Sequence, residues 1–385
     1  MDNLTHSLVG LAIAKSGLER ASPAATTVCI IAANAPDADI LTAFQGSWVY
    51  LHNHRGLTHS IVGTLALALL IPLLVWAGER VIALVRGKQP RVRWRGLLLA
   101  SLIASATHPL LDWTNNYGVR PLLPWSNEWF YGDLVFIIDP WLWLSLGGAT
   151  FLLTAKTKWR VAAWAMLAAI MTAALFLLPA RSGIAIPFVS RVLWLAGIAC
   201  LAFAHRTHLA RRWGASIAVV ALALIIVYWG ALSLLHERAL ADAKIFATHV
   251  AEQNDETIVR LAAMPALANP FHWRCVAETD QAMFRFELKL GAKQWSDTID
   301  EVVRYEKPHG DDAALISKAS VDERAAILLD FARFPVARVE GDCLSRAFVQ
   351  FADLRYTEPG ADGRGTFSLQ VPVSCPPQNF EKISQ

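Results

Sequence analysis

The part of the chain that ends at Asp139 contains ten side chains that are well suited to bind or steer a metal ion, and each lies near the end of an apolar segment. They are His6, Asp37, Asp39, His52, His54, His59, His108, Asp112, Asp133 and Asp139. Carboxylates and imidazoles are costly to bury beside hydrocarbon unless something pairs with them. A divalent cation would pair with several of them at once, so the pattern predicts a metal centre.

His108 and Asp112 form the clearest motif. They are four residues apart, and on a helix this spacing puts both on one face within reach of one ion. Pro109 suits a first helical turn, so His108 is expected near a helix start. The alternative is a buried His and Asp that bond each other or the backbone.

Asp37 and Asp39 follow an apolar run that Pro36 is expected to end, which predicts an irregular turn for both carboxylates. Such a turn could aim them at one ion or bridge two ions. The alternative is a helix cap, since Asx-rich turns after helices are common.

A histidine-rich segment lies just before the next apolar run and contains His52, His54, Arg55 and His59. Neutral histidine is the commonest zinc ligand, and the fork of an arginine can hold a phosphate or a carboxylate, so Arg55 is a candidate anion clamp. The alternative is a set of interfacial histidines in which Thr58 or Ser60 caps the following helix.

His6 and Asp139 are weaker candidates, because an isolated histidine after Thr5 and an aspartate before Pro140 would more often be a cap and a turn. Their place beside the other ligands raises them to predicted metal ligands. Asp39 or Asp139 is the predicted bridging ligand or general base. Asp133 is interpreted as a solvated loop acid.

Composition divides the chain into two parts. Of its 385 residues 55% are hydrophobic, and the apolar runs end near Leu235, after which the sequence is mixed and holds 23 of the 32 acidic residues. We therefore predict a helical membrane domain over 1–235 that carries the metal site, and a soluble α+β domain over 236–385. The net charge of +3 is too small to indicate nucleic-acid binding.

Apolar runs of roughly 18 to 25 residues are long enough to cross a bilayer. Six such runs are Ser60–Leu84, Gly96–Trp113, Leu134–Thr154, Val161–Leu178, Ile184–Ala204 and Trp213–Leu235. Two shorter runs, Leu4–Lys15 and Ala24–Ala35, are too short to be clear spans. The fold class is thus mainly α, a multi-span membrane bundle followed by an α+β domain.

Basic residues gather in three connections between these runs, at 86–95, 156–160 and 206–212, which predicts that these loops are cytoplasmic. Threading the six spans through that pattern puts the tail after Leu235 on the periplasmic side. It also brings the ends that carry the predicted ligands to one face of the membrane.

The tail begins with a predicted helical run over 236–263. Strands are expected at Trp273–Ala277, Met283–Leu290, Ala347–Tyr356 and Thr366–Val373, with a helix at Asp322–Phe334. Of Cys275, Cys343 and Cys375, one pair is expected to be bridged, because an extracytoplasmic compartment allows disulfides.

Four motifs in order resemble the YdjM family of inner-membrane proteins. They are Met1–Ser7, Pro36–Asp39, His54–Ser60 and His108–Asp112, and the resemblance ends near Asp139. It implies a bacterial inner-membrane protein, usually described as a metal-dependent hydrolase. Zinc-dependent phospholipase C is similar more distantly, since it too uses a His-x-x-x-Asp pair.

The leading hypothesis is a hydrolase with one or two divalent ions, zinc first among them, at the periplasmic face. Zinc would lower the pKa of its bound water to about 7 and polarise the scissile oxygen. The location suggests a phospholipid or lipid-linked substrate. Two alternatives are a metal-ion transporter and a sensor or assembly protein in which any metal is structural.

Overall fold

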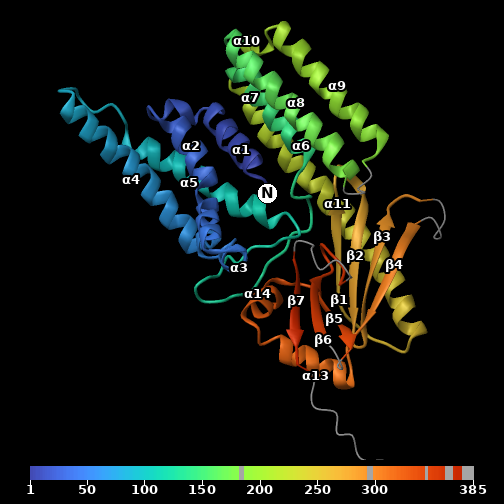
Figure 1. Cartoon of the computed structure of the whole chain (residues 1–385). Helices are drawn as coiled ribbons and strands as arrows, with labels where there is room; N and C mark the ends of the chain where they lie inside the picture. Colours follow the sequence, from blue (N-terminus) through green and yellow to red (C-terminus); the bar gives the residue numbers. More distant parts are fainter. Residues whose placement is uncertain (182–185, 293–297, 343–345, 360–366, 375–385) are drawn as a thin grey trace, which may run out of the picture. The chain divides into compact units, whose positions relative to one another are not determined.

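The computed structural model describes residues 1–181, 186–292, 298–342, 346–359 and 367–374 (Figure 1). The chain divides into two compact units. We call Met1–Thr42, Asn53–Ala239 and Met264–Trp273 the membrane unit, and Ala43–His52, Leu240–Ala263 and Arg274–Gln385 the tail unit.

Three closely packed helices form the centre of the membrane unit: α1 (Asn3–Lys15), α2 (Ala25–Asn34) and α5 (Trp94–Trp113). Glycine allows this close packing. A Cβ added to Gly10 would lie 2.6 Å from the carbonyl oxygen of Cys29, and one added to Gly96 would lie 2.2 Å from that of Ala21. Small residues at such contacts let backbones approach in a membrane bundle, so the ends of these helices are held near one another.

Within the described part of the chain, five helical segments are long and apolar enough to cross a membrane, which agrees with the predicted helical membrane bundle. Four coincide with predicted spans: α4 (Ile61–Val85), α8 (Lys158–Arg181), α9 (Phe188–Arg206) and α11 (Ser216–Gln253). The fifth, Ala25–Gln45, joins α2 to the 3-10 helix η2 (Ala35–Gln45). The α-helix ends at Asn34, before Pro36, as the sequence predicts. Asp37 and Asp39 then lie in a 3-10 helix rather than in the expected irregular turn, since proline needs no hydrogen-bond donor in a first helical turn.

Two predicted spans differ in the structure. Gly96–Trp113 forms α5, but its inward face carries Ser101, Ser105 and Asp112, and α5 is not among the helices apolar enough to span. Leu134–Thr154 becomes helical only at Pro140, in α6 (Pro140–Leu142), η4 (Trp143–Gly147) and α7 (Gly148–Thr154). These pieces together rise about 22 Å, less than the hydrocarbon thickness of about 30 Å.

Short elements complete the membrane unit. They are the 3-10 turns η1 (Leu18–Arg20) and η3 (Leu57–His59), and α10 (Leu209–Trp213). Helix α3 (Ser47–Asn53) lies between η2 and η3 along the chain.

The C-terminal part is α+β, as predicted. One antiparallel sheet has the order β1 (Ile258–Ala266), β2 (Asn269–Thr279), β3 (Ala282–Lys289), β4 (Ile299–Glu306). A second has the order β5 (Pro335–Asp342), β6 (Arg346–Asp353), β7 (Ser368–Val373). Helices α13 (Gly310–Ala319) and α14 (Glu323–Phe331) connect them in sequence.

The four expected strands and the expected helix near Asp322 are confirmed as β2, β3, β6, β7 and α14. The helix expected over 236–263 is wrong beyond Gln253, because Ile258–Ala266 forms β1. Cys275 is buried and free, and Cys343 and Cys375 lie outside the described residues. The expected disulfide therefore stays a prediction.

Candidate metal centre

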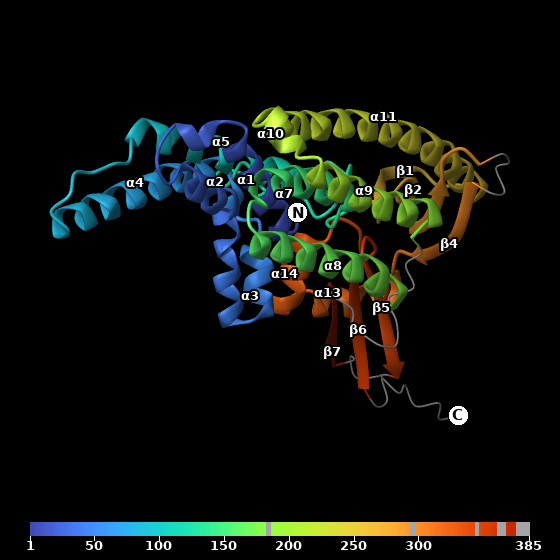
Figure 2. The ribbon, with the colours of Figure 1, turned by 90° about the horizontal axis from the view of Figure 1, so that it is seen from above.

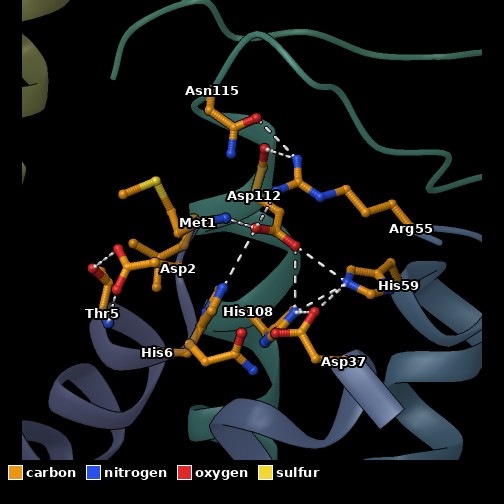
Figure 3. A network of polar contacts seen from close by, with 12 residues as sticks. Met1, Asp2, Thr5, His6, Asp37, Arg55, His59, His108, Asp112 and Asn115 are labelled. Atoms are coloured by element: carbon orange, nitrogen blue, oxygen red, sulfur yellow. Dashed lines mark hydrogen bonds and ion pairs between the residues drawn. The ribbon is translucent and has the colours of Figure 1, made fainter. Parts of the chain in front are cut away.

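Five parts of the membrane unit converge on one cluster of polar side chains (Figure 3). The residues come from α1, η2, the segment after α3, η3 and α5, and they are His6, Asp37, Asp39, His54, Arg55, His59, His108 and Asp112. The turn that carries His59 folds tightly onto α4, where Ser60 caps the helix by accepting a hydrogen bond from the Gly63 amide. Only glycine fits at position 63, since an added Cβ would lie 1.8 Å from the Leu57 carbonyl oxygen.

A first group consists of Asp37, His59, His108 and Asp112, each of which offers one ligand atom within 4.8 Å of the others. Nε2 of His59 lies 3.4 Å from Asp37 Oδ1 and 3.2 Å from Asp112 Oδ2. Nε2 of His108 lies 3.5 Å and 3.3 Å from the same two oxygens. A tetrahedral ion with arms of about 2.0 to 2.2 Å would hold its ligand atoms about 3.3 to 3.6 Å apart, so this spacing fits a shared ion.

The other ring nitrogen of each histidine has its own acceptor. His108 Nδ1 lies 2.6 Å from the Ala33 carbonyl oxygen, and His59 Nδ1 lies 3.1 Å from the Thr58 hydroxyl and 3.4 Å from Asp39 Oδ2. A carbonyl oxygen can only accept, so the Ala33 contact places the proton of neutral His108 on Nδ1 and leaves its Nε2 free for a ligand, the arrangement usual behind metal-binding histidines. Nε2 of His59 lies 3.1 Å from that of His108, so one ion could contact both.

Several buried atoms of the cluster lack a hydrogen-bond partner among the described residues. One is Arg55 Nε, and the other four are Asp37 Oδ2, Asp112 Oδ2 and both ring nitrogens of His6. Buried polar groups are nearly always satisfied, and an unsatisfied group indicates a missing water or ion. The four aspartate and histidine atoms are ligand types for a divalent cation, so the donor set fits a metal.

A second group consists of Asp37, Asp39 and His54, so Asp37 belongs to both groups. His54 Nδ1 lies 3.1 Å from Asp39 Oδ1. The side chains of Asp37 and His54 are 14% and 15% exposed, whereas those of His59 and His108 are fully buried. The second group therefore lies on the more accessible side of the cluster. Burial lowers the pKa of His54, and the hydrogen bond to Asp39 raises it by less. The net lowering favours neutral His54, which is the form that binds a metal.

His6 lies against the first group without being part of it. Its ring stacks on that of His108 with 3.8 Å between centroids, and its Nε2 lies 3.4 Å from Asp112 Oδ1. It is completely buried. His6 can therefore serve as a further ligand or hold the position of its neighbours.

Arg55 supplies positive charge to the cluster. Its Nη2 lies 3.0 Å from Asp112 Oδ1, which also contacts the amino group of Met1, and its Nη1 donates to Asn115 Oδ1 at 2.9 Å. The guanidinium also lies over the ring of Tyr117. These contacts suit a residue that positions Asp112, and the predicted use of Arg55 as an anion clamp stays a prediction.

Asp139 lies outside both groups. One carboxylate oxygen caps α6 by accepting hydrogen bonds from the amides of Trp141 and Leu142, and the other accepts one from the Tyr228 hydroxyl at 2.9 Å. The structure therefore engages both oxygens elsewhere, and a metal-binding or general-base role for Asp139 has no support from this geometry. Asp133 is buried rather than solvated, and it too is absent from both groups.

Sequence reasoning missed three residues. Asn115 and Tyr117 hold Arg55, and their only signal was their position just after the helix that carries Asp112. Trp143 is buried, and its Nε1 donates to Thr5 Oγ1 at 3.1 Å, next to the start of α1. No local pattern indicated that contact.

The convergence of these motifs on one cluster agrees with a comparison of the chain with known families. Residues 1–180 match the YdjM inner membrane protein family. The resemblance drawn from the four motifs is thereby confirmed, and it extends well past Asp139.

A curated relative is the uncharacterized protein YfhP of Bacillus subtilis (strain 168), which is 29% identical over 153 residues. The aligned region covers 38% of this chain and 44% of YfhP, so the chain spans less than half of that relative. No solved structure matches the chain. Together with the five apolar helices, the YdjM resemblance supports a membrane location.

Proposed function

We propose that this chain is a membrane-embedded, metal-dependent hydrolase whose site holds two divalent ions, zinc foremost. The observation that carries the proposal is the sharing of Asp37 by a four-residue group and a three-residue group. Catalytic zinc sites keep three protein ligands and an open position, whereas structural sites are closed by four. The second group, with Asp37, Asp39 and His54, supports the catalytic type.

In this proposal each residue has a distinct task. His59, His108 and Asp112 would hold the inner ion, Asp39 and His54 would hold the outer one, and Asp37 belongs to both groups. A bound zinc ion would supply a Lewis acid and lower the pKa of a bound water to about 7. Asp39 would also orient His59 through its Nδ1, and Arg55 would fix Asp112 and offset its charge.

The surroundings of Asp39 favour a substrate with an apolar part. Ile40 and Leu41 follow it in η2 and are 53% and 62% exposed. Exposed apolar side chains next to a polar site suit a lipid or lipid-linked molecule. We therefore propose a phosphoester or lipid-linked substrate, with Arg55 and the metal ions supplying positive charge near its anionic group.

We further propose that this face and the tail after Leu235 are periplasmic, as the basic loops predict. A reporter enzyme active only outside the cytoplasm, fused after the last residue, should be active. A reporter fused within residues 86–95 should be inactive. The reversed pattern would overturn the orientation without affecting the metal centre.

The two alternatives make different demands on the structure. A metal transporter needs ligands at several depths of the membrane. Among the described residues, only these two groups could hold a metal ion, and they share Asp37. Two adjoining groups do not form an ion path across the membrane. A sensor or assembly protein needs only the closed first group. An ion bound at the second group would therefore favour the hydrolase over the sensor or assembly protein.

The decisive experiment measures metal and activity on the same purified chain in lipid nanodiscs. We expect about two ions per chain, loss of both in Asp37→Asn, loss of the outer one in His54→Ala, and metal-dependent hydrolysis within a panel of phosphomonoesters, phosphodiesters, phospholipids and carboxyl esters. The control is His249→Ala, which changes an exposed histidine of the tail unit. This variant should keep both ions and the activity. No bound metal would overturn the proposal, and one tightly held ion with no activity would favour the structural alternative.

A further inference from the structure

Two cavities of unlike character adjoin each other in the membrane unit, and neither contains a residue of the candidate metal centre. One has a volume of about 310 Å³ and is apolar, lined by α7, α8 and α9 with side chains such as Phe151, Met171 and Trp194. The other, of about 570 Å³, has five charged side chains among its 14 lining residues. His205 lines both, so the two cavities meet at this residue.

The charged cavity is strongly basic. Its lining includes Lys15, Arg20, Lys156 and Arg211 against one acid, Glu19, with which Lys15 forms an ion pair. The unbalanced charge is therefore +3. Lys15, Glu19 and Arg20 lie close together at the end of α1 and in η1. Lys156 follows α7 and Arg211 lies in α10, so three regions that are distant in sequence supply the charge.

The apolar cavity has the length of one leaflet. Its lining on α8 runs from Val161 to Met171 and on α9 from Trp194 to Arg206, which correspond to rises of about 15 and 18 Å. Half of a bilayer core is about 15 Å thick. Figure 2 shows these two helices, labelled α8 and α9.

From this juxtaposition we propose that the membrane unit binds one anionic phospholipid, with the phosphate headgroup in the basic cavity and an acyl chain in the apolar cavity. Basic pockets between membrane helices on the cytoplasmic side suit anionic headgroups. An apolar cavity alone would accept any lipid chain, and a basic cavity alone would accept any small anion. Because the two cavities meet at His205, one molecule with a charged headgroup and an apolar chain can occupy both.

This lipid site is separate from the candidate metal centre. Lys15 lies nine residues after His6 on α1, about 13 Å along the helix axis. Binding of the lipid should therefore be the same in chains that have lost their metal. This makes a failure of the lipid proposal distinguishable from a failure of the proposed hydrolase.

The test is native mass spectrometry of the full chain, partly delipidated in detergent and titrated with phosphatidylglycerol or phosphatidylcholine of equal chain length. We expect one phosphatidylglycerol per chain, bound at least tenfold more tightly than phosphatidylcholine. The triple variant Arg20→Gln, Lys156→Gln, Arg211→Gln should weaken phosphatidylglycerol binding about 100-fold, since each basic residue contributes about fivefold near an anionic headgroup.

The matched control is Arg86→Gln, Lys88→Gln, Arg91→Gln, which removes the same charge from exposed residues that line neither cavity. It should change binding less than threefold. Ala168→Phe, which fills part of the apolar cavity, should weaken phosphatidylglycerol binding. The concentration of inorganic phosphate that displaces the bound phosphatidylglycerol headgroup should stay the same in this variant. Equal losses in both triple variants, equal binding of the two lipids, or an unaffected Ala168→Phe would each overturn the proposal.

Discussion

Buried charge is stabilised differently in the two units. In the tail unit Asp353 and Arg355 are both fully buried and form a closed pair, with 2.6 Å between Oδ2 and Nη2, and Arg355 also donates to the Phe331 carbonyl. In the membrane unit, two groups of aspartate and histidine side chains lie close together. Several of their buried oxygen and nitrogen atoms have no hydrogen-bond partner among the described residues. The first arrangement is complete within the protein, whereas the second leaves ligand-type atoms to which an external cation could bind.

The largest effect is expected from breaking the closed pair. Asp353→Ala leaves the guanidinium of Arg355 buried without its carboxylate, and removal of one partner of a buried pair costs about 3 to 5 kcal/mol. Hydrogen exchange of tail peptides in the full chain measures this loss. Glu306→Ala, which removes a carboxylate that is 66% exposed, is the control and should cost less than about 1 kcal/mol. Equal losses would mean that burial does not separate these two pairs.

Removal of metal should destabilise the candidate metal centre and leave the tail unit unchanged. An ion present at 100 to 1,000 times its dissociation constant stabilises the folded state by about 2.7 to 4.1 kcal/mol. A chelator should therefore increase exchange of the α5 backbone amides and leave the tail peptides unchanged. Restored protection on adding zinc is the control for irreversible damage. Unchanged protection of α5 would contradict a metal-stabilised cluster.

Asp39→Asn should have a smaller effect on the inner ion. Its carboxylate orients His59 from behind, and loss of such a partner typically weakens metal binding by about 10- to 100-fold. A competition titration with a chromophoric chelator measures the change. Asp133→Asn, at a buried aspartate outside both groups, should leave the affinity unchanged. An identical loss in both variants would remove Asp39 from the site.

The smallest effect is a pH dependence in the tail unit. The hydrogen bond from Arg304 holds the pKa of Glu256 below its usual value of 4.5. A depressed carboxyl pKa contributes stability that is fully present above about 4.5 and is lost as the pH falls through the lower, folded value. Acid titration of tail stability should show this loss, and Glu256→Gln should reduce its steepness. An unchanged slope would show that this pair does not contribute.

Much of the site followed from local spacing, while its completion did not. The separation of four residues between His108 and Asp112 needed only a helix, and α5 provides one. The role of Asp139 could not be predicted, because an aspartate before a proline can be a helix cap or a ligand, and Tyr228, its partner, lies 89 residues away. Asn115 was equally hidden, since nothing local shows that it receives Arg55.

The fold shows the same division between local and distant information. Long apolar runs identified α4, α8, α9 and α11, because lipid imposes length and composition on each helix separately. The segment Ile258–Ala266 was assigned partly to a helix because its short apolar pattern suits a helix or a strand, and its pairing in a sheet decides between them. Leu134–Thr154 had the composition of a span, but capping by Asp139 delays its helix.

The membership of Asp37 in both ligand groups has a consequence for how the protein would acquire its ions. A carboxylate held by one ion is already oriented for the second, so occupancy at the two positions is linked, and the linkage is reciprocal. The buried group should fill first and the accessible one second. The chain would then become active only when the accessible position is also occupied.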